Sequence, residues 1–208
     1  MRTPEQWVEI CQGITAGYTP GGRKEDTYPS GVILADILYR LGVWQPGDSI
    51  VDIGSGNGRL AMGFYGQDIT YTGLEIIKPC IEFCQEAFRD IPGFEFIHVD
   101  LQNGHYWGKG AIKPGVQQYP VASHSADVVI AESVFSHTGT IAIARWLYGE
   151  MTRIARPGGK LFSTWFFGEP DESERKTVYR RSEVEDLFTG LVSETQMAVG
   201  QVGILCRT

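Results

Sequence analysis

The segment Ile50-Val-Asp-Ile-Gly-Ser-Gly-Asn-Gly-Arg-Leu60 decides how this chain is expected to fold. A short apolar run carries an acid at residue 52, and a turn dense in glycine then opens a helical stretch. Glycine adopts positive φ without strain and lets a ligand approach the backbone closely. In doubly wound α/β folds such a turn lies at the carboxyl edge of a parallel sheet, where ligands bind. The segment therefore predicts a strand, a ligand-binding turn and a helix, in that order.

Strands and helices are predicted to alternate on both sides of this turn. Apolar runs indicate strands at Ser49–Ile53, Thr70–Leu74, Phe94–Val99, Asp127–Ala131 and Lys160–Trp165, and helical spacing indicates helices at Arg59–Tyr65, Pro79–Asp90 and Thr140–Ala155. This alternation predicts an α/β fold with a parallel sheet covered by helices. The last two runs, Leu191–Val199 and Gln201–Cys206, are too close for a crossover, so we expect an antiparallel hairpin hinged at Gly200.

Three further helix starts are predicted from capping patterns. Thr3 begins a capping box with Pro at the first helical position, Ser30 is expected to cap a second helix, and Ser182–Glu185 is expected to start a short helix through Phe188. The length of 208 residues fits a single domain, residues 1–208. Within it, we expect residues 1–45 to be a helical segment serving the substrate site or covering it as a lid, and residues 46–208 to form the cofactor-binding core.

Composition narrows the class of protein. With 42% hydrophobic and 21% charged residues the chain is typical of a globular protein, and neither a membrane-spanning run nor a signal peptide is evident, so we expect a cytoplasmic protein. The formal net charge of −7 argues against a nucleic-acid partner, and Arg180–Arg181 is interpreted as solvated surface. The four cysteines and four histidines show no metal-ligand spacing, so we expect no metal and reduced, buried thiols.

Two kinds of ligand compete for the glycine turn. A dinucleotide fingerprint, G-x-G-x-x-G, would place its third glycine at position 59, which is Arg59. The chain instead has glycine at positions 54, 56 and 58, preceded by Asp52. An acid is useful for a methionine moiety, which carries an ammonium group as well as a carboxylate. The spacing therefore favours a methionine-containing ligand over a diphosphate.

The segment resembles the first motif of class I S-adenosylmethionine-dependent methyltransferases, and the resemblance extends from about residue 30 to the end of the chain. It implies a three-layer α/β sandwich whose seven-stranded, mostly parallel sheet has the order 3-2-1-4-5-7-6 with an antiparallel strand 7. It also implies that Glu75 holds the ribose hydroxyls, that Asp100 faces the adenine amino group, and that Leu101 offers its N–H to the adenine ring. The full set of expected cofactor-binding residues is Asp52, Gly54, Ser55, Gly56, Asn57, Gly58, Glu75, Ile76, Asp100, Leu101, Glu132 and Ser133.

A narrower resemblance concerns the stretches around the third and fourth strands. Asp100-Leu-Gln-Asn-Gly-His-Tyr106 with Gly110, and Ala126–His137, are similar to a branch that reads D-x-x-N-x-x-Y-x-x-x-G and then D-V-x-x-x-x-S-V-F-x-H. This pattern names no substrate. The turn after the fourth strand reads Glu132-Ser133-Val134-Phe135, without the [N/D]-P-P-[Y/F] of enzymes that methylate amino groups of DNA bases, so base methylation is disfavoured.

The acceptor is expected to be a small molecule methylated on oxygen. His137 follows the fourth strand and is the candidate general base, with Glu132 as a second candidate that contacts either substrate or the methionine ammonium. Both also have a structural interpretation, in packing or capping. Three loops, residues 18–30, 102–125 and 166–181, are expected to supply substrate contacts, and their aromatic residues either stack on a substrate or form satellite core. The expected substrate-binding residues are Tyr18, Tyr28, Tyr106, Trp107, Phe135 and Trp165.

Other functions stay open at this stage. A nicotinamide-dependent oxidoreductase and a non-catalytic subunit that binds S-adenosylmethionine are the alternatives, and protein or RNA methylation has a lower weight. The oligomeric state is open, with a homodimer as one alternative.

Overall fold

The structure is a computed structural model that describes residues 1–14, 23–103, 110–170 and 176–208. These residues contain one seven-stranded sheet with the order β3-β2-β1-β4-β5-β7-β6, which confirms the predicted α/β fold and strand order. The pairs β1–β2, β2–β3 and β4–β5 are parallel, and β7 runs antiparallel to both β5 and β6. The chain divides into two compact units, residues 1–98 and 99–208, which are described in turn.

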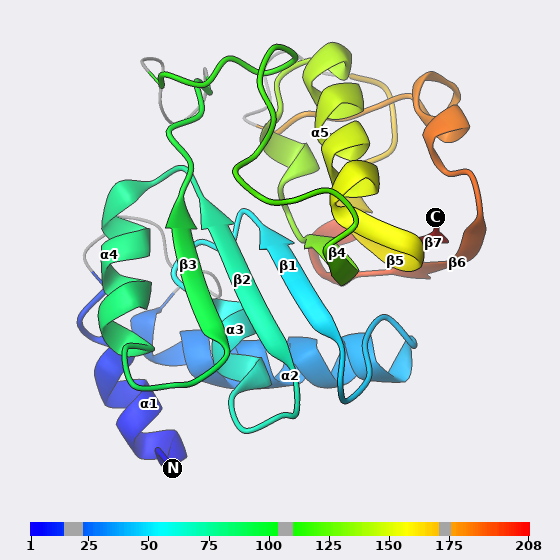
Figure 1. The fold of residues 1–208 in the computed structure, drawn as a ribbon. Helices are drawn as coiled ribbons and strands as arrows, with labels where there is room; N and C mark the ends of the chain where they lie inside the picture. Colours follow the sequence, from blue (N-terminus) through cyan, green and yellow to red (C-terminus); the bar gives the residue numbers. More distant parts are fainter. Residues whose placement is uncertain (15–22, 104–109, 171–175) are drawn as a thin grey trace. The chain divides into compact units, whose positions relative to one another are not determined.

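The first unit contains the helices and strands that flank the glycine turn (Figure 1). Its elements are α1 (Pro4–Cys11), η1 (Lys24–Asp26), α2 (Thr27–Arg40), β1 (Ser49–Ile53), α3 (Arg59–Phe64), β2 (Thr70–Glu75), α4 (Lys78–Ala87) and β3 (Phe94–His98). The strands pair in register, with Asp52 opposite Gly73 and Glu75 opposite His98. The carboxyl ends of β1 and β2 therefore meet at one edge, and each ends at or near a predicted cofactor residue.

Aromatic side chains form the core between α1, α4 and the strands of this unit. The Phe88 ring lies 4.9 Å from Trp7 and 5.0 Å from Phe96, measured between centroids. Helices α2 and α3 approach closely because each has a glycine at the contact. A Cβ on Gly31 would lie 1.9 Å from the Arg59 carbonyl oxygen. These contacts place the start of α3, and with it the end of the glycine turn.

Of the two helix starts predicted in the first unit, one is confirmed and one is wrong. The Thr3 capping box is confirmed, since Gln6 N–H donates to Thr3 Oγ1 and Gln6 Oε1 accepts from Thr3 N–H. The Ser30 cap is wrong, because α2 begins at Thr27 and Ser30 lies in its first turn, where its hydroxyl donates to the Thr27 carbonyl. Pro29 falls within the first turn of α2, where a proline is tolerated, so the helix can begin before it.

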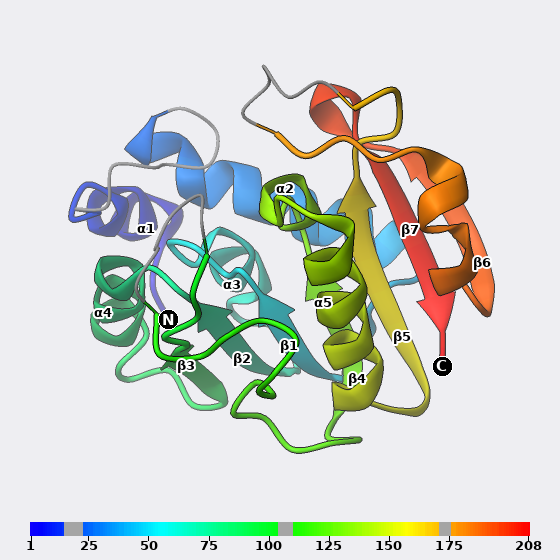
Figure 2. The same ribbon diagram turned by 90° about the horizontal axis from the view of Figure 1, so that it is seen from above.

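The second unit contains the four remaining strands and one long helix, with β7 paired between β5 and β6 (Figure 2). Its elements are β4 (Ala126–Ala131), η2 (Phe135–His137), α5 (Ile141–Ile154), β5 (Ala155–Trp165), η3 (Arg181–Glu183), η4 (Glu185–Leu187), β6 (Leu191–Gln196), η5 (Ala198–Gly200) and β7 (Val202–Arg207). The antiparallel hairpin is confirmed, but the helix predicted from Ser182 is wrong. Two short 3-10 turns replace it, and the capping side chain is that of Glu183, which accepts from Arg180 N–H.

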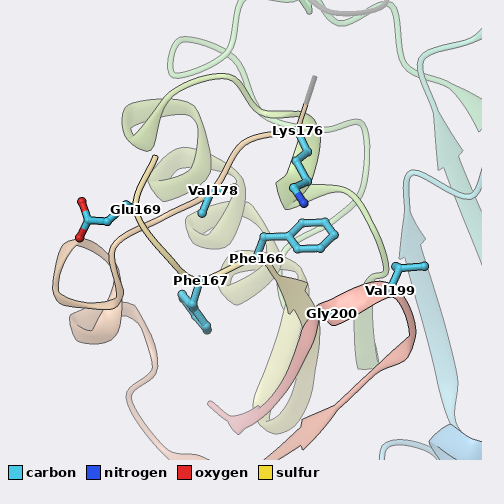
Figure 3. A pocket seen from close by; sticks show the side chains of 7 residues that line it. All are labelled: Phe166, Phe167, Glu169, Lys176, Val178, Val199 and Gly200. Carbon is cyan, nitrogen blue, oxygen red and sulfur yellow. The ribbon is translucent and has the colours of Figure 1, made fainter. Parts of the chain in front are cut away.

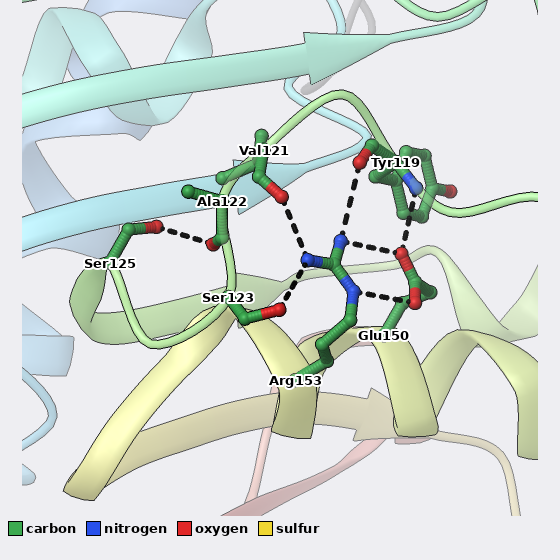
Figure 4. Close-up of polar contacts among 7 residues, drawn as sticks. All are labelled: Tyr119, Val121, Ala122, Ser123, Ser125, Glu150 and Arg153. Carbon is green, nitrogen blue, oxygen red and sulfur yellow. Dashed lines mark hydrogen bonds and ion pairs between the residues drawn. The ribbon is translucent and has the colours of Figure 1, made fainter.

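A buried ion pair fixes the segment that enters β4 (Figure 4). Arg153 on α5 forms two parallel hydrogen bonds to Glu150, from Nε to Oε1 and from Nη2 to Oε2, both 2.8 Å. The same guanidinium donates to the carbonyls of Tyr119 and Val121, and Tyr119 N–H donates to Glu150. Helix α5 therefore holds residues 119–123 against its own surface, so β4 begins at a fixed position.

Candidate functional site

The glycine turn between β1 and α3 needs glycine at three positions. Gly54, Gly56 and Gly58 have φ of 78°, 54° and 74°. This left-handed region is costly for residues with a Cβ. Gly58 is also restricted by space, because a Cβ there would lie 3.0 Å from the Cys84 sulfur. The alternation of glycines that distinguishes the sequence is therefore a backbone requirement of this turn.

The backbone amides of the turn are used inside the first unit. Gly54 and Ser55 donate to the Leu74 carbonyl across 2.7 and 3.0 Å, and Gly58 donates to the Ser55 carbonyl across 3.0 Å. Gly56 donates to the Glu75 carboxylate across 2.9 Å. A diphosphate cradle needs such amides to face the ligand. Since these four already have partners, the geometry supports the inference from spacing that the turn is not a dinucleotide site.

Glu75 ends β2 and is buried. Its Oε2 accepts from Gly56 N–H, and its Oε1 accepts from the N–H groups of Ile76 and Ile77 across 2.7 and 2.8 Å. Burial raises the pKa of Glu75, and the three backbone bonds and the nearby His98 oppose that rise. Two carboxylate oxygens offer about four acceptor sites, so an additional donor, such as a ribose hydroxyl, can still bind there.

Asp52 lies on β1 and is turned toward the neighbouring strand. Its carboxylate is 3% exposed and accepts a 2.6 Å hydrogen bond from the Tyr71 hydroxyl. Burial raises the pKa of Tyr71 well above its usual value, and the Asp52 charge raises it further. Tyr71 was not expected from the sequence, because a tyrosine within an apolar strand looks like ordinary core. The expected contact between Asp52 and a methionine ammonium stays a prediction.

Gly56 fits a bound cofactor better than the other residues of the turn. A Cβ built on Gly56 meets no atom within 4 Å, so the turn is open to the exterior at this position. Ser55 points elsewhere, since its hydroxyl oxygen lies 2.9 Å from where a Cβ on Gly73 would be. The open backbone at Gly56 beside the Glu75 carboxylate matches a ligand that carries hydroxyl groups and needs close approach. The expectation that Gly56 and Glu75 contact S-adenosylmethionine stays a prediction.

In the second unit, Asp100 and Leu101 begin a loop that folds back on residues 110–112. Asp100 Oδ2 accepts from Ala111 N–H across 3.2 Å, and Leu101 pairs with Ile112 as an isolated bridge. Gly110 allows this contact, because a Cβ there would lie 2.2 Å from the Leu101 carbonyl carbon. The Leu101 N–H donates to the Val99 carbonyl across 2.6 Å, so the structure does not support the expectation that it is offered to an adenine ring.

The turn after β4 holds a polar cluster around Ser133. The Ser133 hydroxyl donates to Glu132 Oε1 across 2.8 Å and accepts from the amide of Gln201 across 3.2 Å, while the Ser133 N–H donates to Thr164 Oγ1 across 2.7 Å. Ser133 has φ of 60°, a strained conformation that often marks functional positions. Gln201 is 3% exposed at the start of β7 and was missed by sequence reasoning, since nothing near it in sequence suggests a site.

His137 lies at the end of the short turn η2, which two other segments hold in place. The Asn103 amide donates to the His137 carbonyl across 3.3 Å, and Thr177 N–H donates to the Ser136 carbonyl across 2.7 Å. The Tyr179 hydroxyl donates to the Phe135 carbonyl across 2.8 Å and also contacts the Thr138 hydroxyl. Asn103 and His137 were both noted in the sequence as parts of one pattern, and the structure connects them.

Phe135 and Trp165 are core residues of the second unit. Both are 0% exposed, and their rings stack with centroids 3.9 Å apart. Side chains this deeply buried cannot contact a substrate without repacking, so we assign them a packing role in place of the expected substrate contact. Tyr28 is half-buried in α2 of the first unit, with its ring 6.2 Å from Trp7. Tyr18, Tyr106 and Trp107 lie outside the described residues.

The basic pair Arg180 and Arg181, interpreted from the sequence as solvated surface, forms ion pairs in the structure. Arg180 binds Glu169 across 2.7 Å, and Arg181 forms an ion pair with Glu194. Across the described ranges, His, Cys, Asp and Glu side chains form no group that could hold a metal ion. No helix in the described part of the chain has the length and apolar character that a membrane span requires.

Several solved structures share this fold at low sequence identity. The PH0226 protein from Pyrococcus horikoshii has a TM-score of 0.65 and 16% identity, with 91% of this chain and 94% of that chain covered. A methyltransferase from Aquifex aeolicus that depends on S-adenosylmethionine (SAM) has a TM-score of 0.59 and 14% identity, covering 100% and 99%. Geranyl diphosphate C-methyltransferase from Streptomyces coelicolor, solved with S-adenosyl-L-homocysteine, has a TM-score of 0.58 and 13% identity, covering 84% and 75%.

The family of this chain is assigned by a family model, because the solved structures are too distant in sequence to assign it. The model described as "Methyltransferase domain" matches residues 51–163, more than half of the chain. This range starts in β1, includes the glycine turn, Glu75 and the η2 turn, and ends within β5. The chain belongs to the methyltransferase-domain family, and its cofactor is S-adenosylmethionine.

Proposed function

We propose that this protein transfers the methyl group of S-adenosylmethionine to an oxygen atom of a small-molecule acceptor, with His137 as general base. The observation that carries the proposal is the support of the η2 turn by Asn103, Thr177 and Tyr179. A surface histidine with a structural role needs no such support. A general base does, because proton transfer requires a fixed position within hydrogen-bond reach of the acceptor.

The cofactor, when bound, supplies a methyl group on a positively charged sulfur that is already a good leaving group. The protein therefore contributes chiefly by orienting the acceptor and excluding water. The His137 ring takes the proton of the acceptor hydroxyl, which makes its oxygen a stronger nucleophile. The Glu132 carboxylate, oriented by the Ser133 hydroxyl, binds a donor group of the acceptor or the methionine ammonium.

The cofactor contacts are proposed separately for each unit. In the first, the carboxylates of Asp52 and Glu75 bind the ammonium and the ribose hydroxyls, and the backbone of Gly56 and Ile76 contacts the ligand. In the second, Asp100 binds the adenine amino group. Hydrogen bonds to charged groups contribute about 1.5–3 kcal/mol each, so loss of either carboxylate should weaken binding clearly.

Small-molecule acceptors are favoured over nucleic acid by charge. The net charge is −7, and the adjacent pair Arg180 and Arg181 is neutralised by Glu169 and Glu194. Phosphate backbones are bound by basic surface that is available to them.

We also retain the proposal of a single domain with residues 1–45 as a substrate or lid segment.

The first experiment measures binding of S-adenosylhomocysteine by calorimetry, followed by transfer of a labelled methyl group to a panel of phenols, alcohols, carboxylates, amines and thiols. Methylation of an oxygen is the expected result, and transfer confined to nitrogen, sulfur or carbon would overturn the proposal. Cofactor binding without transfer to any acceptor would identify a non-catalytic subunit instead.

The role of His137 is tested by His137→Gln with His124→Gln as control. We expect His137→Gln to lower kcat by about 10²–10⁴-fold, the usual contribution of general acid–base catalysis, with unchanged affinity for S-adenosylhomocysteine. His124 contacts the Ala155 carbonyl from a position outside η2, so its variant should retain activity. Equal kcat in the two variants would exclude His137 as the base.

A further inference from the structure

A buried glutamine, Gln201, lies between the turn η5 and the strand β7. It is 3% exposed, and its amide nitrogen lies 3.2 Å from the Ser133 hydroxyl oxygen in the turn after β4. Both backbone groups of Gln201 are bonded within the hairpin, since its N–H donates to the Ala198 carbonyl across 3.3 Å and its carbonyl accepts from Met197 N–H across 2.8 Å. The hairpin therefore fixes the backbone of Gln201, and the side chain reaches across to Ser133.

The same hairpin turn forms part of the wall of an open pocket beyond the end of β5 (Figure 3). Val199 and Gly200 line this pocket together with Phe166, the residue that follows β5. Val199 has a φ of 55° and Ser133 a φ of 60°, in a region that residues with a Cβ rarely adopt. Strain of this kind persists only where the surrounding structure imposes it, and it gathers at functional sites. Gln201 follows the first of these strained residues by two positions and contacts the second.

The hydrogen bonds around the Ser133 hydroxyl run in one direction. The hydroxyl accepts from the Gln201 amide and donates to Glu132 Oε1 across 2.8 Å. The amide oxygen of Gln201 is also near, at 3.3 Å, but a hydroxyl has a single hydrogen to donate and the Glu132 contact is shorter. The Ser133 N–H is fixed as well, because it donates across 2.7 Å to the hydroxyl of Thr164, which is 0% exposed. The position of the Glu132 carboxylate therefore depends on a side chain of the distant hairpin.

We propose that Gln201 is a positioning residue for cofactor binding, which acts through Ser133 and Glu132 on the amino-acid part of S-adenosylmethionine. This inference rests on the proposed function, in which Glu132 binds either the acceptor or the methionine ammonium, and it assigns the ammonium. An oxygen acceptor need carry no charge, whereas the ammonium is a cation at neutral pH and so complements a carboxylate whose position is already fixed. Two carboxylate oxygens offer about four acceptor sites, so Glu132 can bind the ammonium in addition to Ser133 and its further contact within the protein.

Two ligands separate this role from a merely structural one. S-adenosylhomocysteine carries the amino-acid part, and methylthioadenosine has the same adenosine and thioether without it. Gln201→Met keeps the length of the buried side chain and removes the amide. We expect calorimetry on this variant to show a loss of affinity for S-adenosylhomocysteine of about three- to tenfold, the range for one hydrogen bond. Affinity for methylthioadenosine should be unchanged, because that ligand has no group for Glu132 to bind.

Gln196→Met is the matched control, because Gln196 lies on β6 of the same hairpin and is exposed. This variant should bind both ligands as the unaltered protein does. Gln201→Asn withdraws the amide by one methylene and carries the same expectation as Gln201→Met, so it keeps the test available if the methionine variant does not fold. Equal losses for the two ligands, or no loss for either, would overturn the proposal.

A double-mutant cycle tests the route through Ser133. Ser133→Ala removes the hydroxyl that joins Gln201 to Glu132, so it should weaken binding of S-adenosylhomocysteine by a factor similar to that of Gln201→Met. Adding Gln201→Met to Ser133→Ala should weaken binding no further, because the connection is already broken. A double variant that loses the product of the two single factors would overturn the proposal, since the two residues would then act independently.

The acceptor panel separates this inference from the proposed function. If the two ligands respond alike in Gln201→Met while an acceptor oxygen is methylated, only the assignment of Gln201 and Glu132 fails. If the two ligands respond differently and no acceptor oxygen is methylated, the proposed reaction fails while Gln201 remains a positioning residue for the cofactor.

Discussion

The carboxylate of Glu75 accepts a hydrogen bond from the backbone N–H of Gly56, with 2.9 Å between Oε2 and the nitrogen. This bond joins the end of β2 to the middle of the glycine turn that follows β1. The acid at the end of the second strand therefore has a structural partner within the glycine turn itself. The same carboxylate retains acceptor capacity, so it can both shape the turn and bind the cofactor.

Replacing Gly56 by alanine should weaken cofactor binding strongly while the protein still folds. The Cβ would project into the open space where we place the ligand, and the positive φ of 54° makes any side chain mildly strained. We expect a loss of about 1 kcal/mol in the free energy of unfolding, and a loss of at least about tenfold in affinity for S-adenosylhomocysteine.

Gly42→Ala is the matched control, because Gly42 has a φ of 71° and a Cβ there also meets nothing within 4 Å. Urea denaturation should show a similar destabilisation for both variants, while calorimetry should show unchanged binding for Gly42→Ala. Unchanged binding by Gly56→Ala would remove this turn from the cofactor site.

Sequence reasoning located the parts of the site that depend on local rules. The positive φ values of the glycine turn follow from turn geometry, so residues 54–58 were predictable as a turn, whereas Glu75 at the end of β2 was expected from the family resemblance. The contacts that were missed act over long separations. Tyr179 bonds to a carbonyl 44 residues away and Gln201 to a hydroxyl 68 residues away, and neither has a local pattern.

Aromatic residues were misjudged for a related reason. Phe135 lies between a predicted strand and a predicted helix, and Trp165 ends a predicted strand, where exposure to a ligand seemed as plausible as burial. The structure brings them together from η2 and β5, and a stacked pair with 0% exposure is core. The sequence contains no signal for that pairing, because it depends on how β4 and β5 align.

Removing Arg153 should destabilise the second unit strongly. Arg153 and Glu150 have side-chain exposures of 15% and 7%, so Arg153→Met leaves a buried carboxylate and two carbonyls without their partner. Breaking a buried pair from one side costs about 3–5 kcal/mol, and partial exposure places our expectation at the lower end, about 3 kcal/mol, in urea denaturation.

The exposed pair of Arg40 and Asp36 provides the control for this prediction. These side chains are 75% and 54% exposed, and surface pairs contribute little. Arg40→Met should leave the unfolding midpoint unchanged. The double variant Glu150→Gln with Arg153→Met should lose less stability than the sum of the losses in the two single variants. A loss equal to that sum would mean that the two residues act independently.

The four cysteines should be unreactive in the folded protein across the neutral and mildly alkaline range. All four are buried, and burial raises the pKa of Cys11 to about 11 and that of Cys80 to about 12. The thiolate is the reactive form, so its population at pH 9 stays small, whereas an ordinary thiol with a pKa near 8.5 is largely ionised there. Labelling with iodoacetamide should stay slow from pH 7 to 9 and become complete in concentrated guanidinium chloride. A native thiol whose labelling rate levels off near pH 8.5 would contradict this burial.

Asparagine in place of Val199 should stabilise the protein. Val199 has a φ of 55° and is 81% exposed, so a β-branched residue is held in a strained conformation with little packing in return. Asparagine tolerates this conformation, and relief of the strain should raise the free energy of unfolding by about 1 kcal/mol. Val116→Asn is the control, since Val116 is similarly exposed at 75% but does not have a positive φ. The expected result is a higher urea midpoint for Val199→Asn alone. Equal midpoints for both variants would show that the hairpin turn before β7 is not strained at Val199.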